Sequence, residues 1–396
     1  MRVLSLSTLF PSPARPAFGR FVANQMRAVA ERRDVELTMV NPIGLPPWPL
    51  SLSEPFRTLA ETPETSELDG LTVRHARFRL IPKVGGDGNP GRIVSAVLPL
   101  ARKLHAAAPF DLVDAQFFFP DGPAAHGIAR ALGVPLTIKA RGSDIHYWGK
   151  RPRALKQMRA AAEAAAGLLA VSEALHREMI ALGMPADKIA VHYTGLDHDR
   201  FQPLPRTAAR ALVSAVPELG VWAEGPLIVV PGALIPLKGQ ELALEALAQL
   251  PGVHLALAGS GPDDARLRSR AEQLGIADRV QFLGQVSHEL LPQLLCAADV
   301  VVLPSEREGL ANAWVEALAC GTPLVIPDIG GAREVVKDAS AGRIVARDPA
   351  AIAAAVRELL AEPPAREAVA ANAARFSWQT NAAELVAFWR KAAGKE

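Results

Sequence analysis

The sequence predicts an α/β protein made of two doubly wound domains, each built on a parallel sheet, that face each other across a cleft. Three observations predict this fold class. The chain has 396 residues, about twice the length of a common domain. Hydrophobic residues make up 49% of it and charged residues 21%, which supplies enough apolar side chains for large cores. Short apolar segments alternate with amphipathic ones in both halves, as in parallel sheets whose strands are linked by helices.

The first half begins with a strand, a helix and a second strand. A loop rich in Pro and Gly, residues 10–19, joins the first strand to the helix, and residues 41–70 hold six prolines, which we interpret as a surface excursion. Apolar runs predict strands over residues 2–6, 35–40, 71–78, 112–119 and 136–140. Amphipathic spacing predicts helices over residues 21–32, 92–105 and 122–132.

The second half repeats this order. Each of its predicted strands is followed by a helical segment, and the strands lie at residues 227–230, 253–258, 280–282, 300–303 and 323–326. We expect domains at residues 1–203 and 226–377, joined by a linker at 204–225 that contains Gly220 and prolines. Ligands of such sheets bind beyond the carboxyl ends of the strands, so the loops that directly follow strands are the places to look for chemistry.

Composition excludes several classes of protein. The two cysteines, Cys296 and Cys320, belong to no Cys-x-x-Cys or Cys/His cluster, which argues against a disulfide framework and a structural zinc site and favours a reducing compartment. No signal peptide is visible, and the longest apolar runs fall far short of the ~20 residues that span a bilayer. We therefore expect a cytoplasmic protein, soluble or peripheral to the membrane.

Charge is unevenly distributed along the chain. Residues 1–200 hold 25 Lys and Arg against 19 Asp and Glu, whereas the remainder holds 18 against 22. The densest basic cluster is Lys150, Arg151, Arg153, Lys156 and Arg159. It is either a solvated helix face or a surface for an anionic membrane or a lipid-phosphate acceptor. Nucleic acid is not expected, because no recognised binding motif accompanies the charge.

The loop after the predicted strand at 300–303 is the richest in polar groups. Glu308 lies on this loop, and Glu316 lies in the helix that follows, which we expect Asn312 to cap and Gly321 to end. The backbone amides of Gly309, Leu310 and Ala311, together with the helix N-terminus, form a natural anion site. Two carboxylates beside such amides suit a sugar nucleotide, although a solvated glutamate pair is the simpler interpretation.

Two other glycine motifs lie in loops of the second half. Lys238-Gly239 is either a surface turn or a phosphate contact. Gly259-Ser260-Gly261 follows a predicted strand, but the third glycine of a dinucleotide fingerprint would fall on Asp264, which argues against an NAD cofactor. The chain has no Gly-x-Ser-x-Gly elbow and no Walker-type phosphate loop.

The loop after the predicted strand at 300–303, with the helix that follows it, resembles a known family. Pro304-Ser305, Glu308-Gly309 and Glu316-Ala317 together resemble the donor motif of the retaining family-four glycosyltransferases of the GT-B fold, also called glycosyl transferases group 1. Other segments resemble that family in order and spacing: Val171-Ser172-Glu173, Thr194-Gly195-Leu196-Asp197, Phe201-Gln202-Pro203, Lys238-Gly239, Ala258-Gly259-Ser260-Gly261-Pro262, Phe282-Leu283-Gly284 and Ala298-Asp299.

The resemblance implies roles for individual residues. Glu316 would bind the nucleotide ribose, Glu308 would contact the donor sugar near its reacting carbon, and Lys238 would neutralise the diphosphate. Gly19 would allow the first loop to approach the phosphates closely. The donor would also contact Gly261, Gly309, Leu310 and Ala311, and the acceptor side would include Asp144 and His146. The last segment, residues 378–396, would form a helix that returns to the first domain.

The chain departs from the family pattern at two positions. Ala233 stands where many members have Arg, and Arg141 stands where many have His before Gly-Ser-Asp. We hypothesise that Arg141, with Lys139, restores the missing positive charge. The alternative is that Arg141 pairs with Asp144 and holds the loop.

The resulting expectation is a retaining, metal-independent hexosyl- or N-acetylhexosaminyltransferase. Its donor would be a UDP- or GDP-sugar, and no cofactor is expected. Its acceptor would be a saccharide or lipid-linked molecule in surface polysaccharide or glycolipid assembly, at the inner face of the membrane. Three alternatives stay open: a sugar-nucleotide epimerase or hydrolase, a phosphorylase, and a non-catalytic nucleotide-sugar-binding scaffold.

Overall fold

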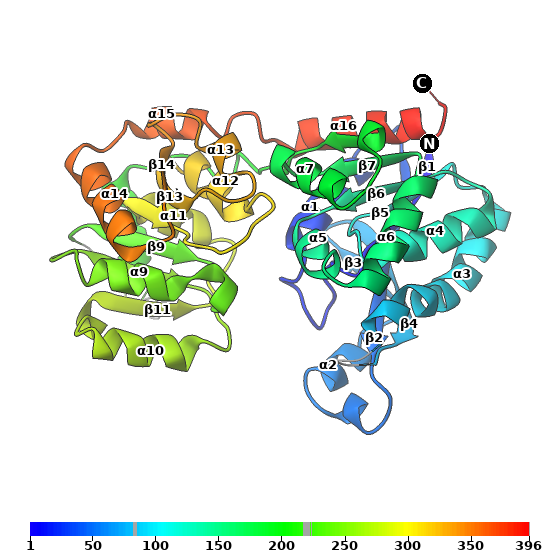
Figure 1. The fold of residues 1–396 in the computed structure, drawn as a ribbon, viewed down its shortest axis with the longest axis horizontal. Coiled ribbons are helices and arrows are strands. Elements are labelled where there is room, and N and C mark those ends of the chain that lie inside the picture. Colours follow the sequence, from blue (N-terminus) through cyan, green and yellow to red (C-terminus); the bar gives the residue numbers. More distant parts are fainter. Residues whose placement is uncertain (82–84, 217–221, 223, 396) are drawn as a thin grey trace. The chain divides into compact units, whose positions relative to one another are not determined.

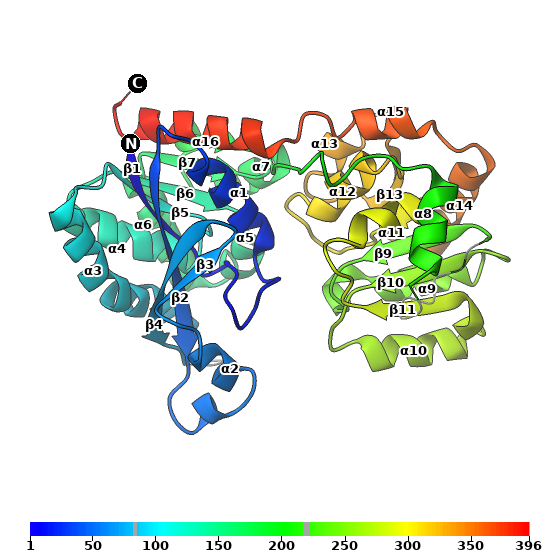
Figure 2. The same cartoon turned by 180° about the vertical axis from the view of Figure 1, so that it is seen from behind.

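The computed structural model of the chain is shown in two views (Figures 1 and 2), and it describes residues 1–81, 85–216, 222 and 224–395. The chain folds as two compact units. The first comprises Met1–Gly195 with Trp378–Glu396, and the second comprises Leu196–Ser377. Each unit is built on one sheet and is described by itself.

The sheet of the first unit has eight strands in the order β3-β4-β2-β1-β5-β6-β7-β8. All neighbouring strands are parallel except β3 and β4. The strands are β1 (Arg2–Leu6), β2 (Glu36–Leu45), β3 (Thr65–Leu68), β4 (Leu71–Arg79), β5 (Leu112–Ala115), β6 (Leu136–Ala140), β7 (Gly167–Ala170) and β8 (Ile189–Val191). The α-helices are α1 (Arg20–Ala30), α2 (Phe56–Ala60), α3 (Asn89–Ala107), α4 (Asp121–Leu132), α5 (Ser143–Trp148), α6 (Pro152–Ala164), α7 (Glu173–Ala181) and α16 (Trp378–Ala392). The short 3-10 helices are η1 (Leu50–Leu52), η2 (Gly86–Gly88) and η3 (Ala186–Lys188).

Strand β2 is longer than its neighbour β1, and this shapes one end of the first unit. Residues 36–40 of β2 pair with β1, whereas its residues 39–45 pair with β4, so the last five residues of β2 continue beyond β1. The segment between β2 and β3, which contains η1 and α2, projects from the first unit past the end of β2 (Figures 1 and 2).

Helix α16 packs into the core of the first unit although it lies at the end of the chain. Its Trp389 is fully buried, and the indole Nε1–H donates to Asp114 Oδ1 on β5 at 3.0 Å. Val386 and Leu385 join the apolar side chains of β1 and α1 in one cluster. The last helix therefore completes the core that the first strand begins.

The sheet of the second unit has six strands, all parallel, in the order β11-β10-β9-β12-β13-β14. They are β9 (Leu227–Pro231), β10 (His254–Ala258), β11 (Val280–Gly284), β12 (Val300–Val302), β13 (Leu324–Pro327) and β14 (Gly342–Val345). The α-helices are α8 (Arg206–Ser214), α9 (Gln240–Leu247), α10 (Asp264–Gln273), α11 (Leu291–Ala297), α12 (Asn312–Ala319), α13 (Ala332–Val335), α14 (Pro349–Ala361) and α15 (Arg366–Ala371). The 3-10 helices are η4 (Pro236–Lys238) and η5 (Ala277–Arg279).

The predicted fold class, two parallel-sheet α/β domains, is confirmed. Strands β1 and β6 have the predicted bounds, whereas the strand predicted at 112–119 ends at Ala115. The sequence prediction did not name β3, β7, β8 and β14. Within the predicted linker at 204–225, the structure has α8 in the second unit, and residues 217–221, with Gly220, and 223 lie outside the described part of the chain.

Candidate active site

Lys238 and Glu308 form an ion pair at the carboxyl ends of β9 and β12. Lys238 Nζ donates to Glu308 Oε1 at 2.5 Å, and the two side chains are 23% and 14% exposed. The loop that carries Glu308 is joined to η4 by a backbone hydrogen bond from Glu306 N–H to Leu237 O at 2.8 Å. The structure thus brings together two residues that lie far apart in the sequence and that the family resemblance assigns to the donor.

Gly239 makes this approach possible. Its φ is 68°, in the left-handed region, and a Cβ at this position would lie 2.3 Å from the carbonyl oxygen of Pro304. Only glycine therefore allows the turn after Lys238 to lie against the end of β12. Close packing against Pro304 therefore requires glycine in the Lys238-Gly239 motif, and the same packing positions the lysine.

The amides at the start of α12 are free. Within the described residues, the N–H groups of Gly309, Leu310 and Ala311 have no acceptor. A turn after β13 supports this loop: Gly331 N–H donates to Gly309 O at 2.8 Å, and a Cβ at Gly330 would lie 2.1 Å from Glu308 O. Free amides at a helix N-terminus attract anions, because the helix dipole adds to their partial positive charge.

The start of α12 differs from the prediction in one respect. Its N-cap residue is Ala311, without a side-chain cap, and Asn312 is already the first helical residue. The expectation that Asn312 caps the helix is therefore wrong, because a cap must precede the helical residues. Gly321, with φ 73°, follows the last turn as expected.

Glu316 lies on α12 and is half-buried. Within the part of the chain that the structure describes, its carboxylate has no hydrogen bond or ion pair. Burial raises the pKa of this carboxyl to about 7. An unpaired carboxylate in such a position gains most from hydroxyl groups that donate to it, as the two hydroxyls of a ribose do.

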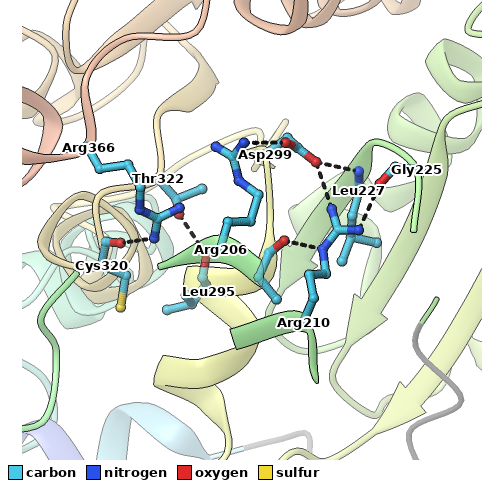
Figure 3. Close-up of polar contacts among 10 residues, drawn as sticks. Arg206, Arg210, Gly225, Leu227, Leu295, Asp299, Cys320, Thr322 and Arg366 are labelled. Atoms are coloured by element: carbon cyan, nitrogen blue, oxygen red, sulfur yellow. Dashed lines mark hydrogen bonds and ion pairs between the residues drawn. The ribbon is translucent and has the colours of Figure 1, made fainter. Parts of the chain in front are cut away.

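The end of α12 is fixed by contacts that Figure 3 shows. Arg366 Nη2 donates to Cys320 O at 2.6 Å, and Thr322 Oγ1 donates to Leu295 O at 2.7 Å. The same view shows Asp299 between Arg206 and Arg210 of α8, at 2.8 Å from each. The Ala298-Asp299 motif thus anchors α8 to this sheet and has no part in the site.

Gly261 is explained by packing. A Cβ at Gly261 would lie 2.2 Å from Leu234 O, and Leu234 N–H donates to Ser260 O at 3.0 Å. The Gly-Ser-Gly loop therefore lies directly against the loop after β9. Ala233, on that loop, is exposed.

Gly19 also has a local reason. It precedes α1 with φ 69°, and a Cβ at this position would lie 2.5 Å from Leu9 O. The loop between β1 and α1 can close on itself only with glycine there. Approach of a phosphate stays a prediction that the described residues do not test.

Arg141 is held by two glutamines. Its Nη2 donates to Gln25 Oε1 and to Gln116 Oε1, each at 2.6 Å, and its Nε donates to Gln116 O at 3.1 Å. Burial lowers the pKa of this guanidinium to about 10. The contact with Asp144 runs through the backbone N–H of Arg141, not through the guanidinium. Arg141 is therefore fixed in the first unit by its own neighbours.

Lys139 lies inside the first unit. It is fully buried, and its Nζ is 2.7 Å from His192 Nδ1, whose Nε2 is 2.9 Å from Asn381 O. Burial lowers the pKa of both Lys139 and His192. The hypothesis that Lys139 presents its charge to the site is wrong, because the side chain does not reach the surface.

Asp144 and His146, expected on the acceptor side, are both engaged. The carboxylate of Asp144 is fully buried and accepts from the backbone N–H groups of Phe118, Arg141, Gly142 and Ile145 at 2.6 to 3.1 Å. His146 Nε2 lies 2.7 Å from Glu178 Oε2 on α7. These contacts give both residues a role in holding the loop after β6.

Two residues with site-like properties escaped the sequence prediction. Asp121, the first residue of α4, is fully buried; its Oδ2 accepts from Thr8 N–H at 2.7 Å, its Oδ1 has no partner, and burial raises its pKa to about 8. Arg347 donates from Nε to Pro304 O at 2.9 Å, and its Nη2 would lie 3.2 Å from a Cβ at Gly239. Both residues follow a strand at its carboxyl end, and this position is the signal that could have identified them from the sequence.

In residues 1–81, 85–216, 222 and 224–395, no group of three or more His, Cys, Asp or Glu side chains could hold a metal ion.

Two parallel-sheet α/β units are the architecture of the GT-B glycosyltransferases, and in the second unit Lys238, Glu308 and Glu316 lie on the turn, loop and helix that follow its strands. Residues 217–376 match the family described as glycosyl transferases group 1, and residues 18–200 match glycosyltransferase family 4. A D-inositol 3-phosphate glycosyltransferase from Geodermatophilus obscurus is 31% identical over 358 residues, which cover 82% of this chain and 76% of that protein. The chain belongs to this glycosyltransferase family.

Other similarities are more partial or concern the fold alone. A protein of the same name from Mycobacterium tuberculosis is 38% identical over 233 residues, which span 55% of this chain and about half, 47%, of that protein. Sucrose-phosphate synthase from Thermosynechococcus elongatus has a TM-score of 0.80 at 20% identity, with all of both chains covered. Anabaena HepE in complex with UDP-glucose has a TM-score of 0.71 at 22% identity, with 98% of this chain and 99% of that chain covered.

Proposed function

We propose that this glycosyltransferase moves a hexose or N-acetylhexosamine from a UDP- or GDP-sugar to an acceptor, with retention of the anomeric configuration and without a metal ion. One observation carries the proposal: beyond the carboxyl ends of β9 and β12 lie an ion-paired lysine and, within the described residues, three amides and a carboxyl that have no partner. This set matches the parts of a nucleotide sugar, which are a diphosphate, a hydroxyl-rich sugar and a ribose. The structural neighbour solved with UDP-glucose supports a UDP-sugar.

Each group has a task in this proposal. The amides of residues 309–311 and the ammonium of Lys238 stabilise the charge that builds on the diphosphate as the sugar departs. Glu308 accepts hydrogen bonds from the donor sugar, and Glu316 accepts from the ribose. Because Lys238 and Glu308 are already paired at 2.5 Å, the lysine is oriented before the donor arrives.

The acceptor proposed is a saccharide or a lipid-linked molecule, used in surface polysaccharide or glycolipid assembly at the inner membrane face. Residues 150–162 hold five Lys and Arg and no Asp or Glu, which favours an anionic surface or acceptor. Two relatives are named for transfer to an inositol phosphate, also an anionic acceptor. No described helix has the length and apolar character needed to cross a membrane.

The experiment is a donor screen with a lipid extract as acceptor. We expect nucleoside diphosphate release from one UDP- or GDP-sugar only when the extract is present, an anomeric NMR signal that keeps the donor configuration, and unchanged turnover in EDTA. Sugar conversion or hydrolysis without acceptor would instead indicate an epimerase or hydrolase. Turnover that needs inorganic phosphate would indicate a phosphorylase, and no turnover of any donor would indicate a scaffold.

A further inference from the structure

The first unit contains a pocket of about 270 Å³ that the proposed donor chemistry does not use. It lies between the β1–α1 loop, the part of β2 that extends beyond β1, and helix α2. Its wall is largely apolar and includes four phenylalanines, Phe10, Phe18, Phe56 and Phe78. Such a lining accepts an apolar group, since each ring that a ligand covers is removed from water.

One unpaired cation lies in the wall of this pocket. Arg15 comes from the β1–α1 loop, which also holds Gly19. Its guanidinium lies over the ring of Phe18 at 5.9 Å from the ring centre, and no acidic side chain pairs with it within the described residues. A free guanidinium beside an aromatic wall suits a phosphate that is attached to an apolar body.

The segment that forms one side of the pocket has an exposed apolar tip. Trp48, Leu50 and Leu52 are 77%, 51% and 63% exposed, and α2, only a few residues further on, supplies Phe56 and Leu59 to the pocket wall. This segment projects from the first unit (Figures 1 and 2). Three large apolar side chains at a projecting tip are costly in water and favourable in the interface of a bilayer.

Positive charge near the pocket is also complementary to an anionic bilayer. Asn89, which lines the pocket, directly follows η2, and the carbonyl of Asp87 in η2 accepts from Gln157 on α6 at 2.9 Å. Helix α6 therefore lies next to this end of the unit. Its exposed Arg153 and Lys156 have no acidic partner among the described residues.

We propose that the tip formed by Trp48, Leu50 and Leu52 inserts into a bilayer and that the adjacent pocket receives a lipid phosphate, with the apolar chain against the phenylalanines and the phosphate at Arg15. This inference rests on the proposed function, for which it names the acceptor as a membrane lipid phosphate. The occupant is a bilayer lipid, because a bilayer would bury the exposed apolar tip, whereas a soluble phosphate ester would leave it in water.

Flotation with vesicles tests the tip. Wild type should float with phosphatidylcholine vesicles that contain phosphatidic acid. A Trp48→Ser/Leu50→Ser/Leu52→Ser variant should bind them about a thousandfold more weakly, because burying each of the three side chains is worth about tenfold in affinity. Leu212→Ser, at a leucine that is 52% exposed on α8, is the matched control and should float as wild type does. A triple variant that floats normally would overturn the proposal.

A second pair of variants tests the pocket. Arg15→Gln should weaken the preference for phosphatidic acid over phosphatidylcholine alone, whereas Arg33→Gln, at an exposed arginine without a partner in the described residues, should keep it unchanged. Equal effects of the two variants would overturn the phosphate site. Displacement of the protein from vesicles by inositol 3-phosphate would overturn the assignment of a bilayer lipid as the occupant. Nucleotide binding, measured in the same variants, should be unchanged. If the wild type binds no nucleotide, the donor proposal fails while the vesicle result still stands.

Discussion

Glu316 is the residue whose chemistry the structure makes most testable. Its carboxyl has no partner in the described residues, and burial raises its pKa to about 7. The raised pKa means that the proton is held below pH 7, whereas ribose hydroxyls stabilise the ionised form. Binding of a nucleotide should therefore release a proton below this pH.

We predict that affinity for the nucleoside diphosphate rises with pH up to about 7, by as much as about tenfold per pH unit, and then levels off. Glu316→Gln should bind more weakly and show a flat profile over the same range. Calorimetry in buffers of different ionisation enthalpy measures both the affinity and the proton release. A wild-type profile as flat as that of the variant would contradict this role.

Substitution of Lys238 and substitution of Glu308 should have different effects on binding of the nucleoside diphosphate. Lys238→Gln removes the cation from the diphosphate, so we expect nucleoside diphosphate binding to fall by about 2 kcal/mol. Glu308→Gln frees the lysine, so binding of the diphosphate should hold or tighten while turnover of the sugar donor falls about a hundredfold. Titration and steady-state kinetics of both variants are the measurements. Equal losses of binding would show that the pair acts only as a structural bridge.

Asp144 is a structural residue in this account. Its carboxylate accepts from four backbone amides, and an asparagine would present N–H groups to some of them. We expect Asp144→Asn to lower the free energy of unfolding by about 2 kcal/mol. Asp187→Asn, at an exposed aspartate, should change it by less than about 0.5 kcal/mol. Urea denaturation compares them, and equal midpoints would contradict this assignment.

At the scale of single elements, the sequence predicted the buried strands best. Strands such as β9 and β12 are continuous apolar runs, because both faces of a parallel sheet are covered. Strand β3 is an edge strand with the sequence Thr-Ser-Glu-Leu and has no such run, so it could not be found this way. The start of α12 was misplaced by one residue because asparagine is frequent both as a cap and within the first turn.

The turn after η4 offers a test of how an element positions the site. Gly239→Ala adds a Cβ that would lie 2.3 Å from Pro304 O, so it should displace Lys238 from Glu308 and cost about 2 to 4 kcal/mol of stability. Gly252→Ala is the matched control: φ is 73° there as well, but nothing lies within 4 Å of the added atom, and we expect a cost of about 1 kcal/mol. Thermal unfolding and nucleotide affinity should separate the two variants. Equal losses of stability and of nucleotide affinity in the two variants would show that backbone strain, and not contact with Pro304, causes the effect of Gly239→Ala.

At the scale of the whole molecule, the alternation of apolar and amphipathic segments was sufficient to predict the fold, and the loop motifs were sufficient to predict the family. The charge network of the first unit could not be predicted, because nothing local in the sequence indicates that Arg141 would bind Gln25 and Gln116 or that Lys139 would be buried against His192. Such contacts join segments that only the folded sheet brings together. The apolar tip at residues 48–52 could not be predicted for the same reason, since the exposure of a side chain is a property of the folded unit.

The central claim is that the second unit binds a nucleoside diphosphate sugar through Glu316 and its neighbours. The most direct test is calorimetric titration of UDP, GDP and ADP into the wild type and into Glu316→Ala. We predict that one of the three nucleotides binds the wild type and that this binding is lost in the variant, which would place the donor site and identify its base. Absence of binding by all three, or binding that the variant retains unchanged, would show that Glu316 and its neighbours do not form a nucleotide site.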